Sequence, residues 1–417
     1  MNQIIKNKFF SNKLTNKSFF GPFVFLFLSI LILLIFTNFY PIITDNEGGA
    51  IGVGAKILNI GDRNFYLSSN NEIYRDIKPS FLYPLVLNLI KDFVGLWGYD
   101  QYSKLWNFLV IVLSSILSLT SLILICDTAW ELFGSKVAKI SGWIYVLCPY
   151  TTFFVLSGSL TNYVFLGTTF CFWTLSKSEL FITKNKIKKP LSPFQTILIL
   201  SFTGIYLSFL RPTGAIFNIL FLSLIIINLK LRFFANSKEK FLSIFFLCIS
   251  IAISFYELKI SSSYIDFSLR IFQNEKGNFF GVKREIMRNR LFIGSELIFD
   301  KLKNILLIAL WKVSDFFSGL NDIRDTHTIF TYENSPPLTP FILRVFTGIF
   351  YFAPINILAL LGFVKSRKII FIHKFWIFFV SIFISLSPSI IGVASNRYLF
   401  MFYSPFIIFS AIVLSDI

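Results

Sequence analysis

Acidic residues are scarce over most of this chain. Seventeen of the 22 Asp and Glu fall in two stretches, residues 41–103 and 257–340. Cysteine and histidine are also rare, with four and two residues, and every cysteine stands in an apolar segment without metal-ligand spacing. We therefore interpret Cys126, Cys148, Cys171 and Cys248 as small packing residues rather than metal ligands.

The sequence lacks the polar surface that a soluble domain needs. Hydrophobic residues make up 55% of the chain, and the mean hydropathy is +0.69. A hydrocarbon core about 30 Å thick is crossed by roughly 20 helical residues, and several apolar segments approach that length. The composition therefore predicts an all-α, polytopic bundle of transmembrane helices.

The net charge of +17 is a topology signal rather than a mark of nucleic-acid binding. The short polar segments hold 19 Lys and Arg against four acids, whereas the two long stretches hold 16 against 17. Short loops rich in Lys and Arg stay in the cytoplasm, while long loops of mixed charge are translocated. The basic segments are expected to face the cytoplasm and anionic lipid, with no nucleic-acid partner. These segments are 1–18, 127–139, 177–192, 230–240 and 365–374.

About ten spans, starting with a cytoplasmic N-terminus, satisfy this charge distribution. They are expected at 19–40, 105–126, 138–157, 160–176, 194–210, 212–231, 241–259, 341–363, 372–392 and 398–415. The first is read as uncleaved, because no small-x-small site follows it. The apolar segment Asn304–Leu320 contains Trp311, Lys312 and Asp315, which favours an interfacial or re-entrant helix. Residues 1–417 form one membrane domain, with outer loops at about 41–103 and 257–340.

The first outer loop is expected to contain two helices of its own. Residues 48–60 have a helical pattern, and residues 79–96 form an amphipathic pattern that begins with proline, as helix N-termini prefer. Helices lying on the membrane surface would hold the polar residues between them at the outer edge of the bundle.

The predicted topology gathers polar residues on the outer face. Charges at membrane depth are costly, and they usually face a polar cavity or a partner. Arginine suits an anionic ligand, because its planar fork binds phosphate or carboxylate with two donors. The candidate residues on this face are Asp45, Glu47, Asp76, Lys78, Tyr83, Asn162, Arg211, Arg397 and Tyr398.

The order of these motifs resembles the GT-C superfamily of integral membrane glycosyltransferases. A carboxylate follows the first span, a K-P-x-x-x-Y-P element precedes an amphipathic helix, and Thr161 lies in a stretch of small residues. R-P-T-G then marks an outer helix end, and R-Y opens the last span. The resemblance covers nearly the whole chain and lies nearest the protein-mannosyltransferase and aminoarabinose-transferase branch.

The resemblance implies an enzyme that uses a polyprenyl-phosphate sugar on the extracytoplasmic face, with inversion. The general base would be Asp45 or Glu47, with Asp45 preferred, and it would deprotonate the hydroxyl of a glycan, lipid or protein acceptor. Arg211, Arg397 and Lys78 would bind the donor phosphate. Asp76, Tyr83, Asn162 and Tyr398 would line the substrate cavity. The composition and length suit a multi-pass protein of the bacterial inner (plasma) membrane, in the cell envelope, that builds cell-surface glycan or modifies lipid.

Two departures from the family pattern leave alternatives open. The family often has an acid where this chain has Asn162, and the usual Asp-Glu pair is split by Asn46. Metal dependence is therefore open: a divalent cation is allowed as a cofactor, but no residue is assigned to it. Asp45 and Glu47 could instead cap a surface helix, and Arg211 and Arg397 could reach the headgroups. The rival functions are a transporter or flippase for lipid-linked saccharides, and a catalytically silent scaffold.

Overall fold

α-Helices make up nearly all of the part of the chain that the structure describes. The computed structural model describes residues 17–36, 82–99, 103–156, 158–181, 190–228, 236–260, 348–391 and 400–417. Within these ranges the β-structure is one isolated bridge between Ser178 and Leu191. The helices are α1 (Lys17–Phe36), α3 (Leu82–Gly95), α4 (Lys104–Phe133), α5 (Ser135–Val146), α6 (Pro149–Leu156), α7 (Leu160–Lys177), α8 (Pro193–Leu210), α9 (Pro212–Asn228), α10 (Ser237–Ile260), α16 (Ala353–Lys365), α17 (Arg367–Ile372), α18 (Trp376–Ile391) and α20 (Ser404–Leu414), with a π-turn at Gly348–Phe352 before α16.

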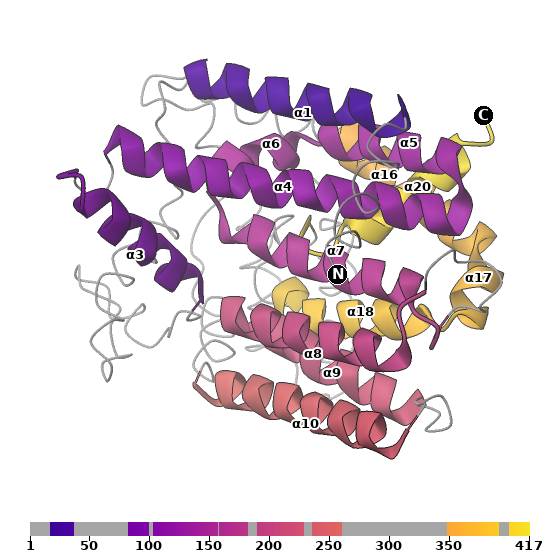
Figure 1. The fold of residues 1–417 in the computed structure, drawn as a ribbon. Helices are drawn as coiled ribbons and strands as arrows, with labels where there is room; N and C mark the ends of the chain where they lie inside the picture. The colour runs from indigo at the N-terminus through magenta and orange to yellow at the C-terminus, as the bar shows by residue number, and fades with distance from the viewer. Residues whose placement is uncertain are drawn as a thin grey trace, which may run out of the picture.

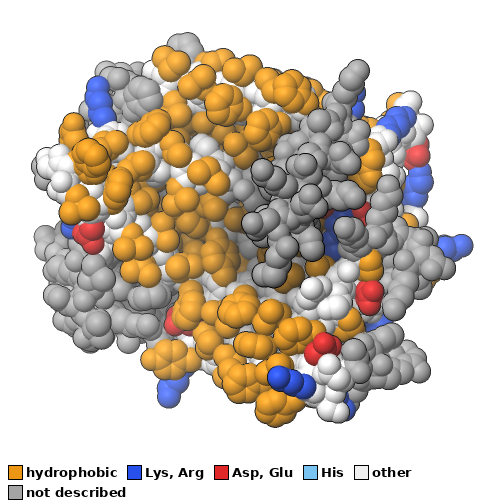
Figure 2. Space-filling model, viewed as in Figure 1, with side chains coloured by type: hydrophobic (Ala, Val, Ile, Leu, Met, Phe, Trp, Pro, Cys, Tyr) orange, Lys and Arg blue, Asp and Glu red, His pale blue; other side chains and the backbone are white. Residues whose placement is uncertain are grey.

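The apolar helices indicate a membrane protein. Three described helices are long and apolar enough to cross a bilayer: Lys104–Phe133, Pro193–Leu210 and Ser237–Lys259. Five shorter apolar helices accompany them, at Phe20–Ile32, Pro212–Asn228, Phe350–Lys365, Trp376–Leu386 and Ser404–Leu414. Hydrophobic side chains cover most of the described part of one face, and charged side chains gather towards its edges (Figure 2). The expected number of about ten crossings stays a prediction.

Parallel pairing of helices that are not consecutive in the sequence organises the bundle. Polar contacts between α4 and α7 join Ser114 to Asn162 and Glu131 to Lys177, at separations of 48 and 46 residues. Contacts between α8 and α10 likewise join Ser208 to Ser254 at a separation of 46 residues. Because the residue numbers rise together on both partners, the two helices of each pair run in the same direction. The helices α16 and α20 are also parallel, because Asn356 contacts Tyr403 and Lys365 contacts Asp416.

The described helix ends fall at two opposite ends of this bundle (Figure 1). We call one the Lys177 end. There the last turn of α7 contacts α4, Thr196 of α8 donates to Ser178, and Lys374 donates to Asn228 O at the end of α9. We call the other the Arg211 end, where α3 lies against the start of α7 and the end of α8. Most of the described basic residues are in segments at the Lys177 end: Lys136, Lys139, Lys177, Lys238, Lys240, Lys365, Arg367, Lys368 and Lys374.

The span expected at 138–157 is two helices, α5 and α6, rather than one. Proline at position 149 has no N–H to donate to Tyr145 O one turn back. Two other donors reach that carbonyl: the backbone N–H of Cys148 at 3.2 Å and Thr151 Oγ1 at 2.8 Å. The Tyr145 carbonyl is therefore satisfied within the break between α5 and α6.

The expected amphipathic helix at 79–96 is α3, Leu82–Gly95, which packs on α4 and α8. Leu87 and Val94 on its inner face are buried, whereas Leu89 and Phe93 are exposed. The expected helix at 48–60 and the segment Asn304–Leu320 lie outside the described residues. α3 therefore closes the Arg211 end beside the start of α7.

Candidate functional site

Three of the nine predicted site residues lie in the described part of the chain. They are Tyr83 in α3, Asn162 in α7 and Arg211 between α8 and α9. The other six lie outside the described residues, and their predicted roles stay predictions: Asp45, Glu47, Asp76, Lys78, Arg397 and Tyr398. All three described residues lie at the Arg211 end, although they come from segments far apart in the sequence.

Tyr83 fastens α3 to the turn that precedes α7. Its side chain is 2% exposed, and its hydroxyl donates to Gly158 O at 3.0 Å. Its ring meets the edge of Tyr163, with the ring centroids 5.4 Å apart. Gly158 has φ +61°, and a Cβ at this position would clash with the side chain of Val110. The contact therefore holds a tight turn that requires glycine.

Asn162 joins α7 to α4 inside the protein. Ser159 is the N-cap of α7, and its hydroxyl accepts from the Thr161 N–H at 3.1 Å. One residue further, Asn162 Nδ2 donates to Ser114 Oγ at 2.8 Å, and Ser114 donates to Phe154 O at 3.3 Å. Asn162 is 1% exposed, and its Oδ1 has no hydrogen-bond partner among the residues that the structure describes. The amide donates to this hydroxyl, whereas a carboxylate could only accept from it and would take its proton away from Phe154 O.

Arg211 is the residue at which α8 ends and α9 begins. Its backbone is extended (φ −157°, ψ 150°), and its N–H donates to Leu207 O at 3.2 Å. Pro212 then starts α9, as its fixed φ and missing N–H favour at a helix N-terminus. The next helix packs closely, because a Cβ on Gly214 would clash with Leu207 O. The side chain of Arg211 is half-buried at the tip of an apolar hairpin.

A hydrogen bond connects this hairpin to the start of α7. Tyr206, five residues before Arg211, donates its hydroxyl to Tyr163 O at 3.1 Å. Tyr163 is also the ring that Tyr83 contacts. Tyr163 therefore links the hairpin tip to α3, and the three predicted residues belong to one connected region.

The described residues contain no cluster that predicts a metal centre. Among them, no group of three or more His, Cys, Asp and Glu is placed to hold an ion. Cys126, Cys148 and Cys171 are buried free thiols and Cys248 is an exposed one. Three of the four cysteines thus occupy packed positions, as the sequence suggested.

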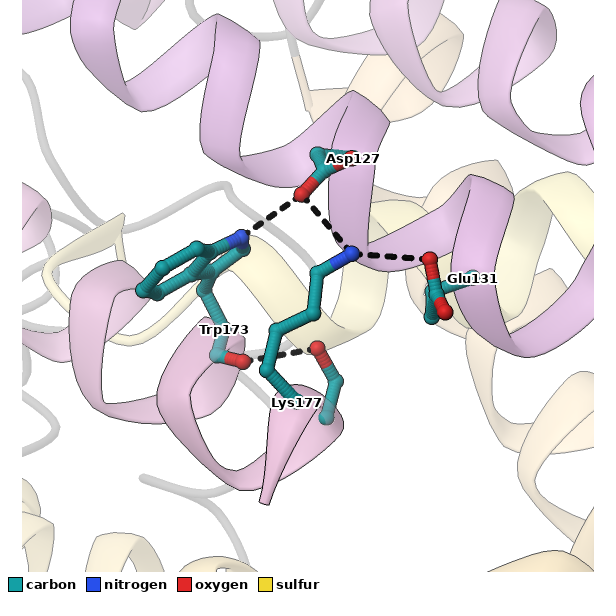
Figure 3. A network of polar contacts seen from close by, with 5 residues as sticks. Asp127, Glu131, Trp173 and Lys177 are labelled. Carbon is teal, nitrogen blue, oxygen red and sulfur yellow. Dashed lines mark hydrogen bonds and ion pairs between the residues drawn. The ribbon is translucent and has the colours of Figure 1, made fainter. Parts of the chain in front are cut away.

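Among the described residues, the most extensive charged network lies at the opposite end, and sequence reasoning missed it (Figure 3). Lys177 Nζ lies 2.8 Å from Glu131 Oε2 and 3.1 Å from Asp127 Oδ2. Trp173 Nε1 donates to the same Asp127 oxygen at 2.8 Å. The two acids are four residues apart on α4, and Trp173 and Lys177 are four apart on α7, so each pair shares a helix face. This matched spacing of four residues was the signal in the sequence from which the network could have been predicted.

Comparisons with known proteins give a weak structural likeness. No protein-family model matches the chain, and neither does any curated protein. Among solved structures, the apo oligosaccharyltransferase of Archaeoglobus fulgidus is 13% identical, with a TM-score of 0.49. The match covers 97% of this chain and 51% of the archaeal chain. A second structure is the archaeal oligosaccharyltransferase AglB from A. fulgidus in complex with an inhibitory peptide and a dolichol-phosphate. It is 13% identical with a TM-score of 0.48, and the match covers 95% of this chain and 50% of AglB.

The chain spans about half the length of these archaeal enzymes. A third structure is the A. fulgidus enzyme tethered to an acceptor peptide containing the NVT sequon. It has 15% identity and a TM-score of 0.41, and the match covers 95% of this chain and 49% of the archaeal chain. A likeness of this size does not determine an activity. The proposed function therefore depends on the residues of the chain itself.

Proposed function

We propose that this chain is a membrane glycosyltransferase of the GT-C type, with its active site at the Arg211 end. The observation that carries the proposal is the convergence of Tyr83, Asn162 and Arg211 at one end of the bundle, while most of the described basic residues lie at the other end. Since basic segments favour the cytoplasm, the Arg211 end would face outside. The donor would be a polyprenyl-phosphate sugar, and the acceptor a hydroxyl of a glycan, lipid or protein.

The proposed reaction is an inverting substitution at the anomeric carbon. Asp45 or Glu47 accepts the proton of the acceptor hydroxyl, and the hydroxyl oxygen attacks the anomeric carbon. The bond from that carbon to the phosphate oxygen breaks, and its electron pair leaves with the polyprenyl phosphate. Arg211, with Arg397 and Lys78, stabilises the negative charge that develops on the phosphate.

The position of Arg211 suits this role. The guanidinium carries five N–H donors in a rigid plane, so it can contact a phosphate with two donors and still reach a protein acceptor. Its place at the end of α8, in an extended residue fixed by the N–H bond to Leu207 O, anchors the backbone that supports the guanidinium. Tyr83 and Asn162 would shape the site by holding α3 and α4 against the start of α7 rather than by touching substrate.

The polar networks of the described residues do not favour the transporter alternative. A transporter is expected to place charges near the middle of broken helices. In the described part of the chain, the network of Asp127, Glu131 and Lys177 lies at one end, and Arg211 lies at the other. The polar contacts between α8 and α10 are made by neutral serines, and Asn218 of α9 adds a contact to α10.

The decisive test is sugar transfer in membranes that contain the protein. A panel of radiolabelled polyprenyl-phosphate sugars is supplied to wild type, Asp45→Asn, Glu47→Gln and Arg211→Gln. Asp92→Asn is the matched control, because Asp92 is an exposed carboxylate of α3 at the same end. Loss of about 10²–10⁴-fold in one carboxylate variant alone would identify the base.

Other outcomes separate the alternatives. Full transfer by both carboxylate variants would contradict the assigned base. Movement of labelled donor across sealed vesicles, without transfer, would instead support a flippase. Absence of both activities with all donors and a range of acceptor extracts would support the silent scaffold.

A further inference from the structure

The first turn of α9 contains a buried hydroxyl that the fold leaves without a partner. Thr213 is 1% exposed, and in the described part of the chain its Oγ1 makes no hydrogen bond. A threonine inside a helix can donate to the carbonyl four residues earlier, as Thr203 does to Ile199 O at 2.8 Å. Thr213 lacks such a carbonyl within its own helix, because α8 ends at the extended residue Arg211 and α9 begins at Pro212. The donor of Thr213 is therefore available to a ligand.

The backbone of the same turn adds further donors. The first N–H groups of a helix have no partner within that helix, and Pro212 has no N–H. Those of Thr213 and Gly214 are the ones concerned, since the Ala215 N–H already donates to Arg211 O at 3.1 Å. The 17 residues of α9 align their peptide dipoles, so its N-terminus favours a negative charge. With Arg211 directly before it, this turn gathers a hydroxyl, two N–H groups and a guanidinium.

Thr213 lies on the face of α9 that is turned into the bundle. Phe217 follows it by four residues, about one helical turn, and so shares this face. The ring of Phe217 contacts those of Phe378 in α18 and Phe402, at centroid distances of 5.5 Å and 5.6 Å. Since α9 starts at the Arg211 end, Thr213 lies about one turn nearer that end than these aromatic contacts.

A buried aromatic segment lies between α7 and α9 at the level of Phe217. Residues 400–403 are each 0% exposed and end in a turn before α20. Phe400 stacks on Phe165 of α7 with the centroids 4.8 Å apart, whereas Phe402 contacts Phe217 of α9. Non-helical backbone at membrane depth occurs where it is buried in protein or lines a cavity. A ligand bound at Thr213 would therefore rest on an apolar floor.

An unpaired buried hydroxyl is not a site by itself. Two other buried threonines of the described helices, Thr128 in α4 and Thr169 in α7, also have an Oγ1 without a partner. Both lie in the interior turns of their helices. Thr213 differs because it belongs to a first turn, where backbone donors accompany the hydroxyl, and because it follows Arg211 by two residues.

We propose that Thr213 and the first turn of α9 complete, with Arg211, a binding site for the phosphate of the lipid-linked donor. The inference rests on the proposed function, and it gives a role to the threonine of the R-P-T-G motif. Thr213 Oγ1 donates to one phosphate oxygen, and the N–H groups of Thr213 and Gly214 donate to the others. Hydrogen bonds to an ionised acceptor are stronger than those between neutral groups, so these donors add to the charge of Arg211.

Binding of a short-chain polyprenyl phosphate to the purified protein in detergent tests the site, with native mass spectrometry as the measurement. Thr213→Val replaces the hydroxyl with a methyl group and is expected to weaken binding about tenfold, the size of one lost hydrogen bond to a charged group. Thr213→Ser keeps the hydroxyl and is expected to retain most of the binding. Thr128→Val is the matched control, because it removes a buried unpaired hydroxyl at the Lys177 end. It is expected to leave binding unchanged.

Unfolding without ligand separates a binding role from a packing role. Because Thr213 Oγ1 has no partner in the described structure, Thr213→Val is expected to keep the unfolding midpoint within about 1 °C of wild type or to raise it. Stabilisation by added polyprenyl phosphate is expected to be smaller in Thr213→Val than in wild type. A lower midpoint without ligand, together with unchanged binding, would show that the hydroxyl serves packing and would overturn the site.

Two further lipids identify the group that the turn binds. Polyprenol has the same chain without the phosphate, and Thr213→Val is expected to leave its binding unchanged. Equal losses for the phosphate and the alcohol would overturn a contact with phosphate. Phosphatidylglycerol carries a phosphodiester headgroup and is expected to compete poorly with polyprenyl phosphate in wild type. Equal competition would assign the turn to phospholipid headgroups and overturn its assignment to the donor.

Failure of this site is distinguishable from failure of the proposed function. Binding weakened by Arg211→Gln but unchanged by Thr213→Val would overturn the role of Thr213 and leave the proposed function standing. Binding unchanged in both variants would overturn the assignment of Arg211 to the donor phosphate, and the site with it.

Discussion

Lys177 and Glu131 join the ends of two parallel helices, α7 and α4, through an ion pair of 2.8 Å. Asp127 lies one turn before Glu131 and contacts the same ammonium at 3.1 Å. Two acids thus contact one lysine, whose side chain is 9% exposed. At the other end of the same two helices, Asn162 contacts Ser114. The parallel pair is therefore tied at both of its ends, which fixes the start of α7 where the proposed site lies.

Replacing Lys177 with methionine is expected to destabilise the protein by about 2–4 kcal/mol. The substitution keeps the apolar stem but leaves two partly buried carboxylates without their cation. Thermal unfolding in detergent measures the loss. The control is Lys365→Met, which breaks the pair with Asp416, where the side chains are 52% and 55% exposed. That change is expected to cost no more than about 0.5 kcal/mol, and equal losses in the two variants would contradict the importance of burial.

Replacing Gly204 with alanine is expected to destabilise the bundle by about 1–3 kcal/mol. A Cβ on Gly204 would overlap the amide of Asn218, so α8 and α9 would have to separate and strain the contacts of Asn218 with α10. Gly95→Ala is the matched control, because a Cβ there meets nothing within 4 Å. The control is expected to be neutral or slightly stabilising, since alanine favours helix over glycine. A neutral Gly204→Ala would show that the helices are not in close contact at this level.

Ser114 and Asn162 are expected to be coupled by about 1 kcal/mol. Ser114→Ala and Asn162→Ala each remove the hydrogen bond between α4 and α7, so the second change in the double variant has less left to lose. A double-mutant cycle on unfolding measures the coupling. Asn162→Asp separates this packing role from the acid that the family often has at this position. We expect it to destabilise the protein, because a buried carboxylate can only accept from Ser114, whose hydroxyl then no longer donates to Phe154 O; higher transfer activity in that variant would favour a catalytic role instead.

Removing the hydroxyl of Tyr83 is expected to loosen α3. Tyr83→Phe keeps the ring contact with Tyr163 but leaves the buried Gly158 O without this donor, at a cost of about 1–2 kcal/mol. Hydrogen exchange at the amides of α3 and of the turn at Gly158 should become faster. Tyr99→Phe is the control, because Tyr99 is 53% exposed at the end of the same segment. Unchanged exchange in Tyr83→Phe would contradict the role of Tyr83 as a fastener of α3.

Local signals in the sequence predicted the helices well. The apolar segment 194–210 is α8, and 212–231 corresponds to α9, because each stretch is both apolar and bounded by proline. The split of 138–157 was also encoded, since Pro149 interrupts the hydrogen-bond ladder. The prediction of a single span there was wrong, because it followed hydropathy and not the missing N–H of proline. How the break is tolerated is visible only in the structure, where Thr151 Oγ1 donates to Tyr145 O.

The candidate site was predicted less completely. Tyr83, Asn162 and Arg211 were selected as outer-face residues, and the fold places them at one end. Their individual contacts could not be predicted, because Gly158 O, Ser114 and Leu207 O are brought to them by packing.

By itself, the sequence determined that the chain is a helical membrane protein with a basic end and a less basic end. These properties follow from hydropathy, proline positions and charge counts, which can be read from short stretches of the sequence without knowing how distant segments pack. Only the tertiary structure decided that α4 pairs with α7 and α8 with α10 in parallel, and so which side chains meet. The physical reason is that apolar helices can slide and rotate against one another at little cost in lipid. The register is set by a few small residues and buried polar contacts between distant segments.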